Sequence, residues 1–173
     1  MDETKAKAEY IKAIVINYFR KKKHFPMIAL EARAKLKYRA SRGDRADILA
    51  VTSANILIEV EVKTSINDLK GDIRKEIHQD ILTKAYTYPV HYFCFAVLQE
   101  LEKEAVPVIR EMYPYAGLLV VKEHPVFHYA DVRTVLNPKK IKKPPLTPIQ
   151  IREMQRIMSS NICRMANKIL GIS

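Results

Sequence analysis

The stretch RADILAVTSANILIEVEVK (residues 45–63) decides the fold of this chain. Its alternating and continuous apolar positions predict two short antiparallel strands joined by a three-residue loop, 53–55. Such a loop needs a left-handed residue at its end, and Asn55 is one of the few non-glycine residues that tolerates this conformation. A loop of this length places Asp47 on the first strand opposite Glu61 on the second.

The second strand carries charge on one side. Successive side chains point to opposite faces of a strand, so Glu59, Glu61 and Lys63 share one face and the aliphatic residues between them share the other. Directly opposite residues have Cβ atoms about 4.5–5.5 Å apart, and two carboxylates that close repel each other unless a cation lies between them. Carboxylate oxygens suit Mg²⁺ or Mn²⁺. A slip of one residue would move Asp47 to the other face, and the same pattern is also typical of an ordinary half-exposed strand.

The segments RADILAV, ILIEVEVKTSINDLKGDIRKEIHQDIL and YPVHYFCFAV resemble the PD-(D/E)XK nuclease superfamily, in particular its MmcB-like DNA-repair branch and related phage proteins. The resemblance also includes the later segment YPYAGLLVV. It implies that Asp47 is the motif Asp, that Glu61 and Lys63 form the E-x-K motif, and that the main-chain carbonyl of Val62 joins Asp47 and Glu61 as a metal ligand. Accessory residues implied by the resemblance are Glu31, Asp72, Lys75 and His78.

The order of predicted elements favours an α/β sandwich, and the resemblance implies a restriction-endonuclease-like three-layer α/β/α sandwich with a mixed central sheet. The implied activity is Mg²⁺- or Mn²⁺-dependent hydrolysis of nucleic-acid phosphodiester bonds, as an endonuclease with DNA as the favoured substrate. The expected setting is repair, recombination or phage and mobile-element metabolism. Asp47 and Glu61 would hold the metal ion, while Lys63 would orient or deprotonate the attacking water and stabilise developing charge.

Two other functions are compatible with the same residues. A non-catalytic nucleic-acid-binding module on a nuclease scaffold would need the positive charge but not the carboxylates. An adaptor for acidic proteins would show salt-sensitive binding that nucleic acid does not compete away.

The chain is strongly basic. Its 173 residues carry a formal net charge of +11, from 30 Lys and Arg against 19 Asp and Glu. Such an excess favours a polyanionic partner, most simply nucleic acid. The basic residues that lead into the predicted site are expected to bind it: Arg33, Lys35, Lys37, Arg39, Arg42 and Arg45. Few aromatic residues are interleaved with them, which favours phosphate contacts over base stacking.

Length and composition predict a single folded unit with an appended helix. We expect a nuclease-like α/β core over 1–136, a Lys- and Pro-rich linker over 137–148, and an amphipathic helix over 149–173. The apolar runs are too short for a bilayer and the N-terminus has no apolar signal core, so we expect a cytoplasmic protein without membrane contact. No glycine-rich phosphate loop occurs in the sequence, so no nucleotide cofactor is expected.

Periodicity predicts helices over 3–22, from 67 or 68 to about 86, over 100–112 with a break at Pro107, and over 148–170. Strands are expected at 27–33, 45–52, 56–64, 90–98, 116–123 and 126–131. The apolar stripe of the last helix is expected to pack on the body or on a second subunit, and a homodimer is predicted. Glu59 is interpreted as a salt-bridge partner of a basic residue, and Cys94 and His91 as structural.

Overall fold

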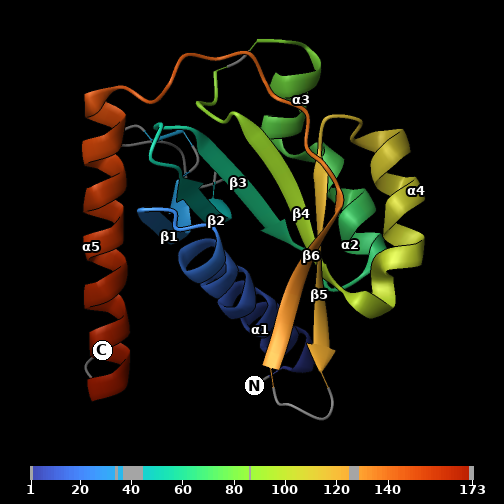
Figure 1. Cartoon of the computed structure of the whole chain (residues 1–173), viewed down its shortest axis with the longest axis horizontal. Coiled ribbons are helices and arrows are strands. Elements are labelled where there is room, and N and C mark those ends of the chain that lie inside the picture. Colours follow the sequence, from blue (N-terminus) through green and yellow to red (C-terminus); the bar gives the residue numbers. More distant parts are fainter. Residues whose placement is uncertain (1, 34, 37–44, 86, 125–128, 172–173) are drawn as a thin grey trace.

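The computed structural model describes residues 2–33, 35–36, 45–85, 87–124 and 129–171. Within these residues a single sheet has the order β1-β2-β3-β4-β5-β6. Its strands are β1 (Met27–Arg33), β2 (Arg45–Val51), β3 (Leu57–Val62), β4 (Tyr92–Leu98), β5 (Gly117–His124) and β6 (Tyr129–Leu136). β3, β4 and β5 run parallel, and the other neighbours pair antiparallel, so the sheet is mixed (Figure 1).

Helices cover both faces of the sheet. They are α1 (Glu3–Asn17), which continues as a π-helical turn (Tyr18–Lys22), then α2 (Ile66–Gly71), α3 (Glu76–Leu82), α4 (Glu102–Met112) and α5 (Pro148–Leu170). On one face Ile11 and Val15 of α1 pack in a cluster with Val60 and Val62. On the other face α2, α3 and α4 contribute to a cluster built around the aromatic residues of β4 (Figure 1). The protein is therefore a mixed α/β fold whose sheet is buried on both sides.

The β2–β3 hairpin has the register that its sequence predicts. Leu49 pairs with Glu59 and Val51 pairs with Leu57, so the next position along the ladder places Asp47 opposite Glu61. Asn55 has the left-handed conformation expected at the end of the loop, with φ of 58°. The continuous apolar run of β4 lies between two parallel neighbours, as predicted for a central strand.

The prediction of one continuous helix after β3 is wrong, because the structure has two short helices, α2 and α3, with a break between them. α2 begins after Ser65, whose hydroxyl accepts a hydrogen bond from the Asp68 N–H, and it ends at Gly71. A 3₁₀ turn (Asp72–Arg74) follows, and Lys75 then adopts an extended backbone before α3 begins. Glycine is a poor helix former, and the break allows Asp72 to reach Lys63 and Lys75 to reach Glu61.

Two further boundaries differ from the sequence prediction. Pro107 lies inside α4 without breaking it; Pro107 and Lys103 are both exposed, so water can solvate the carbonyl that loses its helical N–H partner. The last strand begins at Tyr129 and extends to Leu136 rather than covering 126–131, and residues 126–128 lie outside the described part of the chain.

The segment between β6 and α5 runs extended against the body. Ile141 and Leu146 are buried in it, and the N–H of Ile141 donates to the carbonyl of His91. The His91 ring accepts from Leu57 N–H at 3.0 Å and contacts the carbonyl oxygen of Pro144 at 2.9 Å, so the structural interpretation of His91 is confirmed. Cys94 is likewise buried in the sheet core, as predicted.

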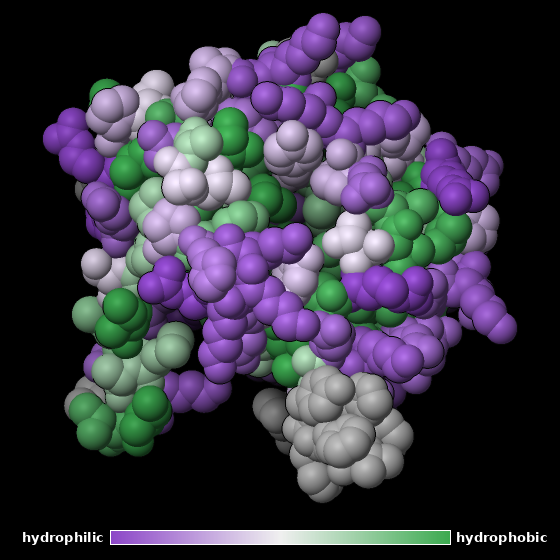
Figure 2. All heavy atoms as spheres, in the orientation of Figure 1, coloured by the Kyte–Doolittle hydropathy of each residue, from purple (hydrophilic) through white to green (hydrophobic). Residues whose placement is uncertain are grey.

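α5 begins where the sequence predicts, with a capping box formed by Thr147 and Gln150. Its first half packs on the body through Met154 and Ile157, which confirms that part of the apolar stripe docks there. Its second half stands clear, with the apolar side chains of Ile162, Met165, Ile169 and Leu170 exposed; they form the green end of this helix in Figure 2. No helix in the described ranges is long and apolar enough to cross a membrane.

Candidate active site

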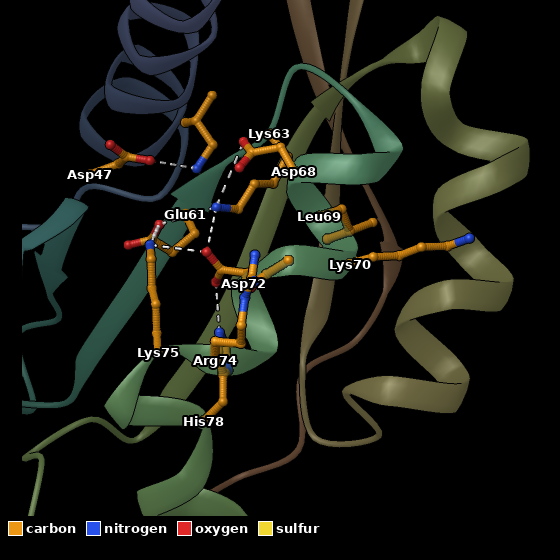
Figure 3. Close-up of polar contacts among 12 residues, drawn as sticks. Asp47, Glu61, Lys63, Asp68, Leu69, Lys70, Asp72, Arg74, Lys75 and His78 are labelled. Atoms are coloured by element: carbon orange, nitrogen blue, oxygen red, sulfur yellow. Dashed lines mark hydrogen bonds and ion pairs between the residues drawn. The ribbon is translucent and has the colours of Figure 1, made fainter.

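An open cavity of about 700 Å³ lies where β3 ends and α2 begins. The predicted catalytic residues Asp47, Glu61 and Lys63 all line it, although they come from two strands and the segment that follows (Figure 3). Val62, Asp72 and Lys75 line it as well, together with the first residues of α1. The structure therefore brings together most of the predicted site.

Asp47 is anchored to the end of β3. Its Oδ2 accepts a hydrogen bond of 2.8 Å from the N–H of Val62, and its Oδ1 lies 3.2 Å from Nζ of Lys12. The carboxylate thus occupies the place where the β2–β3 ladder stops, beside the backbone of the residue that follows Glu61. The hydrogen bond to Oδ2 fixes the position of Asp47 relative to β3, while Oδ1 contacts Lys12 instead of the β3 backbone.

Glu61 is almost fully buried and is surrounded by lysines. Its Oε2 contacts Nζ of Lys75 and lies 3.6 Å from Nζ of Lys63. Burial raises the pKa of Glu61 to about 7, and the nearby carboxylates Asp47 and Asp72 act in the same direction while the two lysines oppose them. Such a shift arises because a buried carboxyl loses the water that would stabilise its charged form.

A chain of buried polar groups lies behind Lys63. Nζ of Lys63 is 2.5 Å from Oδ1 of Asp72, and Oδ2 of Asp72 is 2.6 Å from Nε2 of His78. The Nδ1 atom of His78 is in turn 2.6 Å from the hydroxyl of Tyr115. Figure 3 shows Lys63, Asp72 and His78 following one another in this order. The predicted accessory residues Asp72 and His78 are therefore part of the same network as the predicted catalytic lysine.

The network fixes the protonation of its members. Burial opposes ionisation of Asp72, but the hydrogen bond from His78 and the charges of Lys63 and Lys75 outweigh it and hold the pKa of this carboxyl well below its usual range. Burial lowers the pKa of His78. A neutral His78 can donate its Nε2 proton to Asp72 and accept the Tyr115 proton at Nδ1, which satisfies both ring nitrogens.

The salt bridge predicted for Glu59 is wrong. Glu59 is 2 % exposed, its Oε2 has no hydrogen-bond partner, and it forms no ion pair in the described ranges. Burial raises the pKa of Glu59 well above its ordinary value, and the charge of Glu61 adds to the effect. The nearby lysines contact Glu61 and Asp72 instead, so no ion pair in the described residues offsets the burial of the Glu59 carboxyl.

Lys12 of α1 is a site residue that the sequence analysis missed. It is 7 % exposed, and its ammonium group contacts Glu31 as well as Asp47, with Glu9 at 3.2 Å. Burial would lower the pKa of Lys12, but these carboxylates raise it above its usual range. The available signal was a lysine placed inside an apolar helical stripe, next to Ile11. Glu31, the predicted upstream acid, has a left-handed φ of 49° that interrupts the β1–β2 ladder.

The predicted nucleic-acid-binding residues separate into three groups. Arg33 and Arg45 face each other as the last pair of the β1–β2 ladder. Lys35 forms an ion pair of 2.8 Å with Glu76 and lies over the ring of Tyr88. Lys37, Arg39 and Arg42 lie outside the described residues.

A hydrated divalent ion fits the predicted ligand set. No group of three or more His, Cys, Asp or Glu side chains suited to a metal ion occurs in the described ranges. Asp47, Glu61 and the carbonyl of Val62 were predicted as the ligands, and they are oxygen donors of the kind that Mg²⁺ uses when it binds through one or two carboxylates and keeps several waters. In this structure Asp47 contacts the ammonium group of Lys12 and Glu61 contacts that of Lys75, so each carboxylate already stabilises a positive charge beside it.

Comparison with known proteins defines the fold and no more. No protein-family model matches the chain, and no curated protein matches it. Among solved structures, a protein of unknown function from Silicibacter pomeroyi superposes with a TM-score of 0.61 at 16% sequence identity, over 94% of this chain and 90% of that one. The two proteins share a mixed α/β fold.

Proposed function

We propose that this protein is a Mg²⁺- or Mn²⁺-dependent nuclease that hydrolyses phosphodiester bonds, with DNA as the favoured substrate. One observation carries the proposal: Asp47, Glu61 and Lys63 line the same open cavity, in the register that a metal-binding pair of carboxylates requires. A restriction-endonuclease-like three-layer α/β/α sandwich is the finer fold that we propose with it. The helices on both faces of the mixed sheet support that assignment.

The chain's own residues would divide the work of hydrolysis. Asp47, Glu61 and the carbonyl of Val62 would hold a divalent ion, which when bound neutralises phosphate charge and lowers the pKa of water. Lys63 would orient the attacking water and stabilise the charge that develops on the phosphate. Asp72 keeps Nζ of Lys63 in one place by its 2.5 Å contact. Lys75, which is 39 % exposed at its side chain, is positioned to contact a phosphate oxygen from the open side.

The same site has a non-catalytic alternative, which one observation favours. Lys12 and Lys75 contact Asp47 and Glu61, so the carboxylates could serve to hold these lysines for phosphate binding rather than to bind a metal ion. The network around Lys63 favours catalysis instead. Lys63 is 4 % exposed and is held by Glu61 and Asp72, whereas a lysine that only binds phosphate needs neither this burial nor these contacts. A homodimer, which would pair two active sites for double-strand cutting, stays a prediction.

The decisive experiment is metal-dependent nicking of supercoiled DNA. The native chain should nick in Mg²⁺ or Mn²⁺ and not in EDTA, and Lys63→Ala should lose the activity by at least about 100-fold, the usual size of a lost acid–base or charge-stabilising group. Lys70→Ala is the matched control, because Lys70 is exposed on α2 and its side chain points away from the network (Figure 3). Absence of metal-dependent cleavage of both DNA and RNA by the native chain would overturn the nuclease proposal.

A further inference from the structure

A second cavity, of about 440 Å³, lies between α5 and the end of the β1–β2 ladder. Four arginines dominate its lining, Arg33 and Arg45 from the strands and Arg156 and Arg164 from the helix. We call this cavity, defined by these four residues, the basic cleft. Its polar lining is completed by Ser160, Asn161 and Glu31.

The basic cleft carries more positive charge than its acids offset. Glu31 is the one carboxylate in the described lining, and it already contacts Lys12 on its other side. Arg156 pairs with Glu153 at 2.6 Å, and that carboxylate acts electrostatically on Arg33 as well. Within the described residues, one lining acid and one neighbouring acid therefore stand against four guanidinium groups, so this lining carries a surplus of positive charge.

Two of the arginines, Arg33 and Arg45, face each other across the β1–β2 ladder, and their like charges repel. Arg33 and Arg45 are direct cross-strand partners, and like charges in that position destabilise a sheet. An anion bound between them would remove the repulsion. Arginine is well suited to such a ligand, because its planar guanidinium group can donate two parallel hydrogen bonds to phosphate oxygens.

The wall supplied by α5 is fixed in place. Ile157 is buried beneath the helix, and Oδ1 of Asn161 accepts a hydrogen bond of 2.8 Å from the backbone N–H of Leu30 in β1. Arg156, Ser160 and Arg164 recur four residues apart, so they share one helix face. The helix therefore holds its two arginines at a set position across the cleft from the strand arginines.

The basic cleft adjoins the proposed active site. Glu31 lines the cleft and contacts Lys12, and Lys12 lies 3.2 Å from Asp47, which lines the catalytic cavity. One group of ion pairs thus separates the two cavities. A polymer with charge repeated along its length could occupy both.

We propose that the basic cleft binds the phosphate backbone of the nucleic acid whose reacting bond lies in the catalytic cavity, which makes α5 part of the substrate-binding surface. The identity of the polyanion rests on the proposed function. The described lining contains no aromatic ring, so the cleft contacts phosphates rather than stacked bases. It should accordingly bind without strong sequence preference.

The test measures binding without cleavage, by fluorescence anisotropy of labelled DNA duplex and single strand in EDTA. The cleft variant combines Arg33→Glu and Arg164→Glu. The control combines Arg152→Glu and Lys168→Glu, which make the same change of net charge at exposed α5 positions outside the cleft. The cleft variant should weaken binding at least about tenfold and lower the slope of log K against log salt by about 2, one for each lost phosphate contact, while the control should change affinity less than about twofold.

Several outcomes would overturn the inference. Equal weakening by the cleft and control variants would mean that net charge alone matters, and native-like binding by the cleft variant would mean that the cleft is not used. Stronger binding to polyglutamate than to nucleic acid would assign the cleft to an acidic protein. If charge reversal prevents folding, as judged by thermal unfolding, Arg33→Gln with Arg164→Gln should still weaken binding severalfold against Arg152→Gln with Lys168→Gln.

The nuclease proposal and this inference fail separately. Cleavage by the native chain together with native-like binding by the cleft variant would refute the cleft and leave the nuclease standing. Loss of binding in the cleft variant together with no metal-dependent cleavage would refute the nuclease and support a nucleic-acid-binding cleft.

Discussion

Nζ of Lys63 lies 2.5 Å from Oδ1 of Asp72, and both side chains are almost fully buried. They lie nine positions apart in the chain, and they meet because the backbone turns between α2 and α3. His78 holds Asp72 from behind at 2.6 Å. The lysine that we propose for catalysis is therefore positioned by an acid that is itself fixed by a histidine.

Replacing Asp72 by Asn should cost both stability and activity. The substitution removes the negative charge that lies beside Lys63 and Lys75, and an uncompensated buried charge typically costs about 3–5 kcal/mol. Urea unfolding in EDTA should show a fall in the free energy of unfolding of that order, and nicking should fall because Lys63 is no longer held. Asp68→Asn is the control, since Asp68 is 57% exposed and lies 3.9 Å from the same lysine. Equal stability of the two variants would contradict the positioning role of Asp72.

Replacing Lys12 by Met should leave Glu31 and Asp47 without the cation that they share. The free energy of unfolding should fall by about 3 kcal/mol, the usual scale for breaking a buried ion pair, and Mn²⁺ should raise the melting temperature of the variant more than that of the native chain. Lys7→Met removes an exposed i,i+4 pair with Glu3 and should change little. A Lys12→Met protein that melts like Lys7→Met would show that the carboxylates do not need a cation.

Glu59 should make the native protein less stable as the pH rises. Its carboxyl stays protonated in the fold because burial raises its pKa well above the ordinary value, whereas in the unfolded chain it ionises at about pH 4.3. Above that pH the unfolded state loses a proton that the folded state keeps, so stability falls by about 1.4 kcal/mol per pH unit until the folded pKa is reached.

The neutral variant Glu59→Gln removes this contribution, so its stability advantage over the native chain should grow between pH 5 and pH 8. Urea unfolding at both pH values, without divalent metal, measures the difference and cancels the contribution of Glu61, which both proteins share. Glu104→Gln is the control, because Glu104 is exposed. A pH-independent difference between Glu59→Gln and the native chain would mean that Glu59 is ionised in the fold.

Asn55 should contribute through its backbone conformation. Its φ of 58° is left-handed, a conformation that costs a residue with an ordinary side chain about 1–2 kcal/mol. Asn55→Ala should therefore lower the free energy of unfolding by about 1 kcal/mol, whereas Asn55→Gly should stay within about 0.5 kcal/mol of the native chain. Equal destabilisation by the two substitutions would point to the Asn side chain instead of the backbone.

The parts of the fold that were predictable depend on local sequence. The loop ending in Asn55 and the alternation through Glu59 and Glu61 fixed the register of the hairpin, and the unbroken apolar run of β4 indicated a strand buried on both sides. Thr147 followed by Pro148 marked the start of α5, where the structure adds a capping box with Gln150. Each of these signals lies within a few residues of the feature it specifies.

The parts that were missed depend on contacts between distant segments. The break at Gly71 to Lys75 follows a helical pattern in sequence and becomes favourable only when Glu61 and Lys63 are in place to receive Asp72 and Lys75. Lys12 meets Glu31 and Asp47 because α1 packs across the sheet. Glu59 has no ion pair in the described residues because the lysines near it contact Glu61 and Asp72, which no pattern within β3 can indicate.

The hydrogen bond from Val62 N–H to Asp47 gives the molecule a built-in reporter. A ligand that draws the Asp47 carboxylate toward itself must lengthen or reinforce this one bond, and the exchange rate of a single amide proton follows such changes. Hydrogen–deuterium exchange at the Val62 amide therefore connects the occupancy of the cavity to a signal in the backbone, readable without substrate or turnover.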